Sequence, residues 1–439
     1  MHAGAADLRR HKGEVMFLGV IADDFTGATD IAGFLVNNGL PTVQMNGVSD
    51  IPLPADAEAV VVSLKSRSCP ADEAVSLSLE ALDYLKRAGC SRFFFKYCST
   101  FDSTAKGNIG PVADALLCGL GDDFTVVCPS LPVNGRTVYN GYLFVNGVPL
   151  NESGMRNHPL NPMRDANLMR LMEAQAAGRC GSVPLDVVAR GPEAVTARIA
   201  DLKRQGFSYG VLDALTDRDL DVLALALADM SLVTGGSGLG GALARLRARE
   251  SGRSADGATD PGLPLAGGRT VLLSGSCSEM TNRQVAAYGE RGPVHPVSVD
   301  RCMADVGQYA AEMADVLISA PEGELPPLVS ATVPPDRLAG IQNRFGAEAS
   351  HRQVEAFFAH LAVRLRSAGY DHFIVAGGET ASVITQALGI KGFTIGPQIA
   401  PGVPWVRAVD APLSLALKSG NFGDERFFFT AVGLIPAKS

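Results

Sequence analysis

The chain lacks the short cysteine and histidine spacings that hold metal ions in proteins. Its 8 cysteines form no CxxC pair, and its 7 histidines form no HxxxH pair. Zinc sites typically place their ligands at such spacings, so the sequence predicts no metal site built from these residues. Unpaired cysteines in this number are typical of reduced thiols, and we therefore expect a cytoplasmic protein.

The chain also lacks long apolar runs and an excess of basic residues. No run approaches the roughly 18 apolar residues that cross a bilayer. Lys and Arg number 38 against 46 Asp and Glu, a net charge of −8. This balance argues against a surface built for nucleic acid or anionic membrane, so we expect neither as a partner. The oligomeric state is not indicated.

The first fifteen residues carry Arg9, Arg10 and Lys12 and resemble the charged start of a signal peptide. The apolar run that follows ends at Asp23 after only about seven residues, which is short for a signal sequence. Met16 directly precedes the first predicted strand. We interpret residues 1–15 as a disordered extension without function.

The length of 439 residues predicts two domains, because one hydrophobic core rarely grows so large. Predicted strands at 58–64, 91–97 and 124–128 alternate with predicted helices at 71–88 and 108–119, which indicates βαβ units. The segment 250–268 has few bulky apolar residues and is predicted to be a linker between domains at 16–249 and 269–439. The fold class is α/β, with a largely parallel sheet flanked by helices in each domain and the active site in the cleft between them. The segment 129–165 is long, rich in Pro, Asn and Gly, and without clear periodicity, which is often functional.

The most informative segment is 20–30 (VIADDFTGATD), where an apolar run stops at two adjacent carboxylates, Asp23 and Asp24. Side chains at the carboxyl end of a strand face the ligand crevice of an open α/β sheet. We therefore expect both carboxylates to contact a substrate or a metal ion. Thr26 is predicted to cap a helix that ends before Gly39 and Pro41.

Polar side chains follow the next predicted strands at the same positions. Because the carboxyl ends of parallel strands open on one edge of a sheet, these groups are expected to converge. Arg and Lys suit a carboxylate, whereas Asp, Ser and Thr suit hydroxyls, so the implied ligand is a small polyhydroxylated acid. Capping hydroxyls and solvated charges would explain single members but not the joint pattern. The members are Ser63, Lys65, Ser66, Arg67, Lys96, Ser99, Thr100, Asp102, Ser103 and Thr104.

The second predicted domain contains three glycine-containing turns, each after a predicted strand. They lie at 274–278 (SGSCS), 377–382 (GGETAS) and 418–423 (KSGNFG). Backbone N–H groups at such turns, with a helix dipole behind them, bind phosphate. Three turns in one domain indicate a nucleotide phosphate site, although none has the Gly-Lys-Ser/Thr ending of a Walker A motif.

A fourth glycine-rich segment, 236–241 (GSGLGG), fits the dinucleotide-binding pattern GxGxxG. It supports the alternative of an NAD(P)-dependent sugar-acid oxidoreductase. The acidic residue expected about 20 positions later would be Asp256 or Asp260, which lie in the predicted linker instead of at a strand end. We interpret this segment as a close-packed turn.

Taken together, these motifs resemble the four-carbon acid sugar kinases from about Met16 to the C-terminus. The resemblance within that family is greatest to members acting on 3-oxo-tetronate. The segments that carry it are 21–30 (IADDFTGATD), 64–70 (LKSRSCP), 96–111 (KYCSTFDSTAKGNIGP), 132–138 (PVNGRTV), 273–278 (LSGSCS), 377–380 (GGET) and 417–423 (LKSGNFG).

The resemblance implies an N-terminal substrate domain, a C-terminal nucleotide domain and ATP-dependent phosphorylation of the terminal hydroxyl of a four-carbon 3-keto sugar acid, 3-oxo-tetronate. D-threonate or D-erythronate is the alternative substrate within the family. A sugar acid and ATP are the expected small-molecule partners. By similarity, the ATP-binding residues are Ser276, Gly377, Gly378, Glu379, Thr380 and Gly420, and the substrate-domain candidates are Asp23, Asp24, Arg67 and Lys96.

Phosphoryl transfer depends on positioning and charge neutralisation more than on covalent chemistry. The hypothesis is that the glycine turns hold the ATP phosphates and that Arg67 or Lys96 holds the substrate carboxylate. Asp24 or Asp23 would accept the proton of the attacking hydroxyl. Mg²⁺ would bridge phosphates with help from an acid such as Glu379. A sugar-acid binding protein without catalysis is a further alternative, but it leaves the three phosphate-type turns unexplained.

Overall fold

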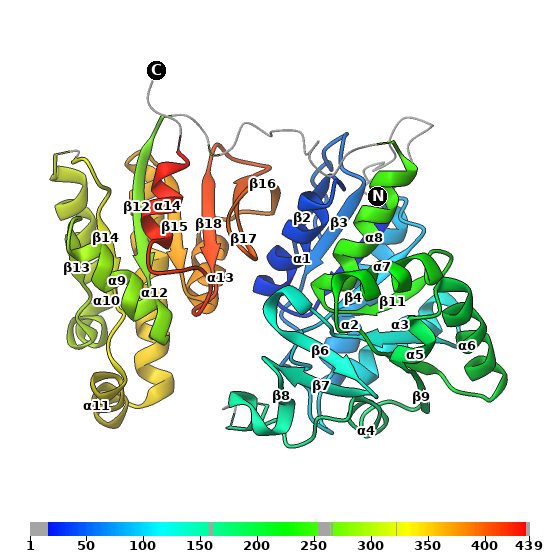
Figure 1. The fold of residues 1–439 in the computed structure, drawn as a ribbon. Coiled ribbons are helices and arrows are strands. Elements are labelled where there is room, and N and C mark those ends of the chain that lie inside the picture. The colour runs from blue at the N-terminus through cyan, green and yellow to red at the C-terminus, as the bar shows by residue number, and fades with distance from the viewer. Residues whose placement is uncertain (1–15, 158–160, 253–263, 265–266, 322, 436–439) are drawn as a thin grey trace, which may run out of the picture. The chain divides into compact units, whose positions relative to one another are not determined.

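The computed structural model describes residues 16–157, 161–252, 264, 267–321 and 323–435. The predicted extension at 1–15 and most of the predicted linker lie outside these residues. The chain divides into two compact units, Met1–Thr259 and Asp260–Ser439. Each unit is an α/β structure with a largely parallel sheet flanked by helices, which confirms the predicted fold class (Figure 1).

The first unit is built on parallel strands in the order β2-β3-β1-β4-β11-β5-β10-β9. Every residue of β1 and β3 is buried, as expected for strands covered on both faces. The central position of β1, between β3 and β4, brings the three polar strand ends to one edge. The strands are β1 (Leu18–Ala22), β2 (Thr42–Asn46), β3 (Ala59–Ser63), β4 (Phe93–Lys96), β5 (Thr125–Cys128), β9 (Cys180–Val183), β10 (Tyr209–Leu212) and β11 (Leu232–Gly235).

The helices of the first unit connect these strands. The predicted helices at 71–88 and 108–119 are confirmed as α2 and α3, and α2 begins after Pro70. Pro70 is the N-cap residue of α2, and no side-chain hydrogen bond caps this helix. The helices are α1 (Phe25–Asn37), α2 (Ala71–Arg87), α3 (Ile109–Leu120), α4 (Leu168–Glu173), α5 (Leu185–Val188), α6 (Pro192–Arg204), α7 (Asp217–Ala226) and α8 (Ser237–Glu250).

The cap of α1 differs from the prediction. Asp24, not Thr26, caps this helix, and its Oδ1 accepts a hydrogen bond from the N–H of Gly27 at 2.7 Å. Asp24 has the extended backbone of an N-cap, whereas Thr26 already lies inside the first turn. The helix ends at Asn37, before Gly39 and Pro41 as predicted, and Gly39 has a φ of 83°.

The segment 129–165 contains a small antiparallel sheet in the order β6-β7-β8. Its strands are β6 (Arg136–Tyr139), β7 (Tyr142–Val145) and β8 (Val148–Pro149). Short 3-10 helices flank it at Pro132–Asn134, Leu150–Glu152 and Gly154–Asn157. Val138 forms an antiparallel bridge with Ala214, so β6 is anchored beside the end of β10. This anchoring fixes Arg136, at the start of β6.

In the glycine-rich segment 236–241, Gly236 is the N-cap of α8, and residues 237–241 are the first residues of that helix. A Cβ atom at Gly236 would lie 2.8 Å from the carbonyl oxygen of Pro129, and one at Gly238 would lie 2.6 Å from that of Ser130. Backbone therefore fills the space in front of these glycines. The close packing is confirmed, but only Gly236 lies in the turn between β11 and α8, because the helix begins at Ser237.

The second unit has the strand order β13-β14-β12-β15-β18-β17-β16. The pairings from β13 to β18 are parallel, and β17 pairs antiparallel with both neighbours. Its strands are β12 (Arg269–Ser274), β13 (Val294–Pro296), β14 (Leu328–Ser330), β15 (Tyr370–Ala376), β16 (Gly392–Ala400), β17 (Val403–Ala408) and β18 (Ser414–Lys418). Its helices are α9 (Glu279–Gly289), α10 (Val299–Ser319), α11 (Pro335–Phe345), α12 (Ala347–Ser367), α13 (Gly378–Ala387) and α14 (Phe427–Gly433).

The core of the second unit supports the strands that end at the glycine turns. Trp405 of β17 and Ile374 of β15 are fully buried together with Phe428 of α14. Burial of aromatic and branched side chains on both faces holds β12, β15 and β18 side by side. Their carboxyl ends therefore present three consecutive turns at one edge.

Candidate active site

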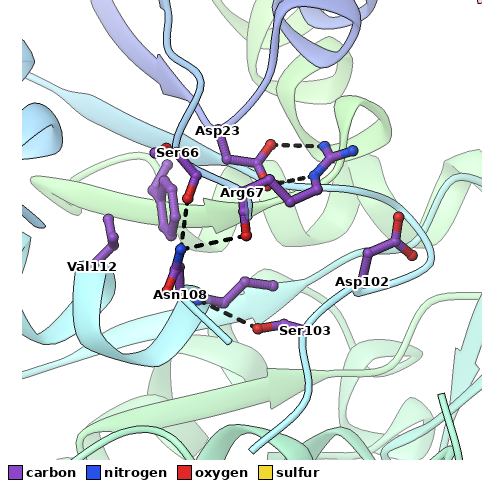
Figure 2. Close-up of a pocket in the computed structure, with 9 residues that line it drawn as sticks. Asp23, Ser66, Arg67, Asp102, Ser103, Asn108 and Val112 are labelled. Carbon is purple, nitrogen blue, oxygen red and sulfur yellow. Dashed lines mark hydrogen bonds and ion pairs between the residues drawn. The ribbon is translucent and has the colours of Figure 1, made fainter. Parts of the chain in front are cut away.

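The paired carboxylates lie directly after β1 and share one arginine. Arg67, in the loop after β3, donates from Nε to Asp23 Oδ2 at 2.9 Å and from Nη2 to Asp23 Oδ1 at 2.8 Å. Its Nη1 lies 2.9 Å from Asp24 Oδ2. The backbone completes the arrangement, because the N–H groups of Ser66 and Arg67 both donate to the carbonyl of Asp23. Figure 2 shows the bidentate pairing of Arg67 with Asp23.

All three guanidinium nitrogens of Arg67 are therefore engaged with the two carboxylates. Burial disfavours its charge, but Asp23 and Asp24 outweigh that effect and raise the pKa of Arg67. Burial raises the pKa of Asp23, and the Arg67 guanidinium acts against that rise. Asp23 is 7% exposed and Asp24 29% exposed, so Asp24 is the carboxylate more open to a ligand. In this arrangement three of the five N–H donors of Arg67 orient the two carboxylates.

Lys96, the last residue of β4, is buried beside these carboxylates. Its Nζ lies 3.9 Å from Oδ2 of Asp30 on α1. A Cβ atom at Gly27 would lie 3.2 Å from that Nζ and 2.3 Å from Asp24 Oδ1. Glycine at position 27 therefore leaves the space in which Asp24 and the Lys96 ammonium approach each other.

Asp30 and Arg136 extend this cluster, and sequence reasoning did not select either as a site residue. Asp30 Oδ2 accepts a hydrogen bond from Ser237 at the start of α8. Burial raises the pKa of Asp30, while Lys96, Ser237 and Arg136 act against the rise. Within the described residues, the buried Asp30 Oδ1 and Arg136 Nε have no hydrogen-bond partner. Both residues stand in motifs that carried the family resemblance.

A loop after β4 forms the other wall of the pocket beside Asp23. Asn108 donates from Nδ2 to the carbonyl oxygens of Ser66 at 2.7 Å and Cys69 at 2.8 Å, which ties this loop to the one carrying Arg67. Asp102 and Ser103 also line the pocket (Figure 2). Of the predicted strand-end groups, Lys65 is exposed, and those that line this pocket are Ser66, Arg67, Asp102 and Ser103.

The three glycine turns of the second unit converge. A Cβ atom at Gly377 would lie 3.2 Å from the backbone nitrogen of Ser276, and one at Gly420 would lie 2.8 Å from Ser276 Oγ. Ser276 follows β12, Gly377 follows β15 and Gly420 follows β18. A side chain at either glycine would enter the space between neighbouring turns, and the φ of 130° at Gly377 also favours glycine there.

The turn after β15 leads directly into α13. Gly377 caps this helix with a φ of 130° and without a side-chain hydrogen bond. The N–H groups of Gly378, Glu379 and Thr380 lie in the first turn, where a helix has no internal acceptor for them. These donors and the positive end of the helix dipole form a site suited to a phosphate group.

Two further classes of feature are absent from the part of the chain that the structure describes. It contains no group of three or more His, Cys, Asp or Glu side chains placed to hold a metal ion. None of its helices is long and apolar enough to cross a membrane.

Comparisons with known proteins divide the chain in the same way. Residues 18–243 match the model of a sugar-binding N-terminal domain, and residues 271–428 match that of a nucleotide-binding C-terminal domain. The 3-oxo-tetronate kinase of Brucella melitensis biotype 1 is 57% identical over 416 residues, 95% of each chain. That of Salmonella typhimurium is 56% identical, covering 94% of this chain and 98% of the relative.

A solved structure extends this similarity to three dimensions. The crystal structure of protein HI1011 of Haemophilus influenzae has a TM-score of 0.82 and 54% identity, covering 95% of this chain and all of that one. The sugar-binding model covers the cluster around Asp24 and Lys96, and the nucleotide-binding model covers the converging glycine turns. The chain belongs to the four-carbon acid sugar kinase family.

Proposed function

We propose that this kinase transfers the γ-phosphoryl group of ATP to the 4-hydroxyl of 3-oxo-tetronate. The observation that carries the proposal is identity of 54–58% over nearly the whole chain to several relatives named 3-oxo-tetronate kinase. The clustered acids and cations of the first unit suit a sugar acid, and the turns of the second suit ATP. Phosphoryl transfer requires the sugar acid and ATP to be bound at the same time. We also place the enzyme in the cytoplasm, where ATP is available.

Asp24 is the proposed general base. It is the second residue after β1, it is more exposed than Asp23, and its Oδ1 accepts a hydrogen bond from the N–H of Gly27. Arg67 fixes the plane of both carboxylates through its three nitrogens. Asp24 would accept the hydroxyl proton as the oxygen attacks phosphorus, which a positioned carboxylate can do within hydrogen-bond distance. In this proposal Asp23 positions the Arg67 guanidinium and takes no part in proton transfer.

Lys96 and Arg136 are the proposed partners of the substrate carboxylate. Arg67 is already engaged with two acids, whereas Arg136 has a buried Nε that no described residue accepts from. Lys96 is buried at the same edge, 3.9 Å from Asp30. A guanidinium and an ammonium beside one carboxylate give both charge and orientation.

The nucleotide phosphates are proposed to bind Ser276, the first turn of α13 from Gly377 to Thr380, and Gly420. Mg²⁺ suits this site, because it is commonly held by one or two carboxylates together with substrate phosphates. Glu379 lies in the first turn of α13 and supplies such a carboxylate. Bound there, the ion would neutralise charge on the transferred group.

Replacing Arg136 by Met is expected to raise KM for the sugar acid by about 10- to 100-fold, because a charge-assisted contact to the carboxylate is lost. KM for ATP should change less than threefold. Steady-state kinetics with each substrate varied would measure both constants. Arg198→Met is the matched control, because Arg198 bonds to the Ser182 carbonyl and Asp201 on α6. An unchanged acid KM in the Arg136 variant would remove Arg136 from the acid site.

The function itself is tested by ADP release from ATP and Mg²⁺ in the presence of 3-oxo-tetronate, D-threonate or D-erythronate. We expect strong turnover with the keto acid alone. Turnover only with an unoxidised acid would keep the kinase and change its substrate. If none of the acids stimulates ADP release, and NAD or NADP in place of ATP raises the melting temperature, the oxidoreductase alternative would replace it.

A further inference from the structure

Lys418 is a buried lysine at the end of β18 whose acceptors are all neutral. Its Nζ donates to the carbonyl oxygens of Ser419 at 3.1 Å and Gly420 at 2.6 Å, and to Thr281 Oγ1 at 3.0 Å. The side chain is fully buried. An ammonium group carries three N–H donors, and three acceptors surround this one.

These contacts join the Gly420 turn to the N-terminus of α9. The hydroxyl of Thr281 itself donates to the carbonyl of Gly420 at 2.7 Å and accepts from Ser278 Oγ at 3.0 Å. Ser278 is the N-cap of α9. Because the carbonyls of Ser419 and Gly420 both accept from the ammonium, the backbone of the turn is held in one orientation. The ring of Phe427 closes the other side, 5.8 Å from Nζ.

The ammonium has no carboxylate among these contacts. The acids on the neighbouring elements have other partners. Glu279 forms an ion pair with Arg283, Glu425 also lies near Arg283, and Glu379 interacts electrostatically with His351. Burial accordingly lowers the pKa of Lys418 to about 7. Burial of a cation without a counter-ion costs desolvation free energy, and an anion bound nearby would offset that cost.

We propose that Lys418 is a positioning residue for the nucleotide phosphates: its ammonium holds the turn at Ser419 and Gly420 and places a positive charge directly behind it. This inference rests on the proposed nucleotide site. In other nucleotide sites a Walker A lysine supplies a positive charge by direct contact with the phosphates. Here the charge would come from Lys418, which is enclosed behind the turn and would act on the phosphates through its electrostatic field.

The test compares binding of ATP, ADP and adenosine by calorimetry in the wild type and in Lys418→Met. We expect the affinity for ATP and ADP to fall about 10- to 100-fold in the variant, and that for adenosine to change less than twofold. KM for ATP should rise while KM for the sugar acid stays within threefold. Thr281→Val is the matched control, because it removes one contact of the same cluster but keeps the charge.

Proton uptake in the wild type keeps the proposal testable if Lys418→Met does not fold. At pH 8, binding of MgATP in buffers of different ionisation enthalpy should take up a substantial fraction of one proton as Lys418 becomes charged, and adenosine should take up none. Equal loss of adenosine and ATP affinity in the variant, or no proton uptake by the wild type, would overturn the proposal. Wild-type protein that binds ATP in this manner but phosphorylates no four-carbon acid would contradict the proposed function and leave the role of Lys418 standing.

Discussion

The Asp24→Asn variant is expected to lose about 10²- to 10⁴-fold in kcat, because an amide cannot accept the proton of the attacking hydroxyl. Its fold should be kept. Asn caps helices as well as Asp does, so the hydrogen bond from the N–H of Gly27 to the side chain at position 24 can persist. KM for ATP should stay near the wild-type value, since the glycine turns are untouched. Steady-state kinetics together with thermal unfolding would separate chemistry from folding.

The control for this variant is Asp221→Asn. Asp221 pairs with Arg245 on α8 at 2.7 Å, so the change removes a comparable ion pair from two helices. It should leave kcat within about twofold, because surface and helix ion pairs contribute little. If Asp24→Asn retains a kcat within threefold of the wild type, Asp24 is not the base. Asp30, whose buried Oδ1 has no partner among the described residues, would then be the next carboxylate to replace.

Replacing Gly377 by Ala is expected to raise KM for ATP by about 100-fold or more. The residue has a φ of 130°, which side chains rarely adopt, and its Cβ atom would lie 2.9 Å from Thr380 Oγ1 and 3.2 Å from the nitrogen of Ser276. Relief of that crowding must move the start of α13 or the Ser276 turn, and both carry the proposed phosphate donors. KM for the sugar acid should change little. Kinetics with ATP varied would measure the effect.

Gly369→Ala separates backbone strain from damage to the nucleotide site. Gly369 also has a positive φ, 85°, but a Cβ atom there would meet nothing within 4 Å. This variant should lose on the order of 1 kcal/mol of stability and keep its KM for ATP. If both alanine variants show the same KM for ATP, the turn at Gly377 does not hold phosphates.

The helices and strands that the sequence predicts best are those with a continuous apolar pattern between turn residues. The predicted strand at 58–64 is found at Ala59–Ser63, and the predicted helix at 71–88 is found at Ala71–Arg87. In both, one continuous apolar pattern is bounded by turn residues. The predicted cap of α1 was wrong because Asp and Thr are both favoured N-cap residues. Only the extended backbone at Asp24, seen in the structure, decides between Asp24 and Thr26.

The predicted site is also clearest where its parts are local. Each glycine turn is a short motif after a strand, so its phosphate-type chemistry is visible in sequence. The cluster around Lys96 joins residues that are distant in the sequence. Ser237 bonds to Asp30, 207 positions away, and Arg136 lies on a strand of the small antiparallel sheet. Spacing alone cannot reveal such a contact, or show that Arg67 is already shared between two carboxylates.

The most direct test of the central claim is the position of the phosphate in the product. The enzyme would be incubated with ATP, Mg²⁺ and 3-oxo-tetronate, and the product examined by phosphorus NMR with proton coupling. Transfer to the 4-hydroxyl predicts one new phosphomonoester signal split into a triplet by the two C4 protons, formed in equal amount to ADP. A doublet would place the phosphate on O2 and contradict the account, as would ADP and free phosphate without any phosphorylated acid.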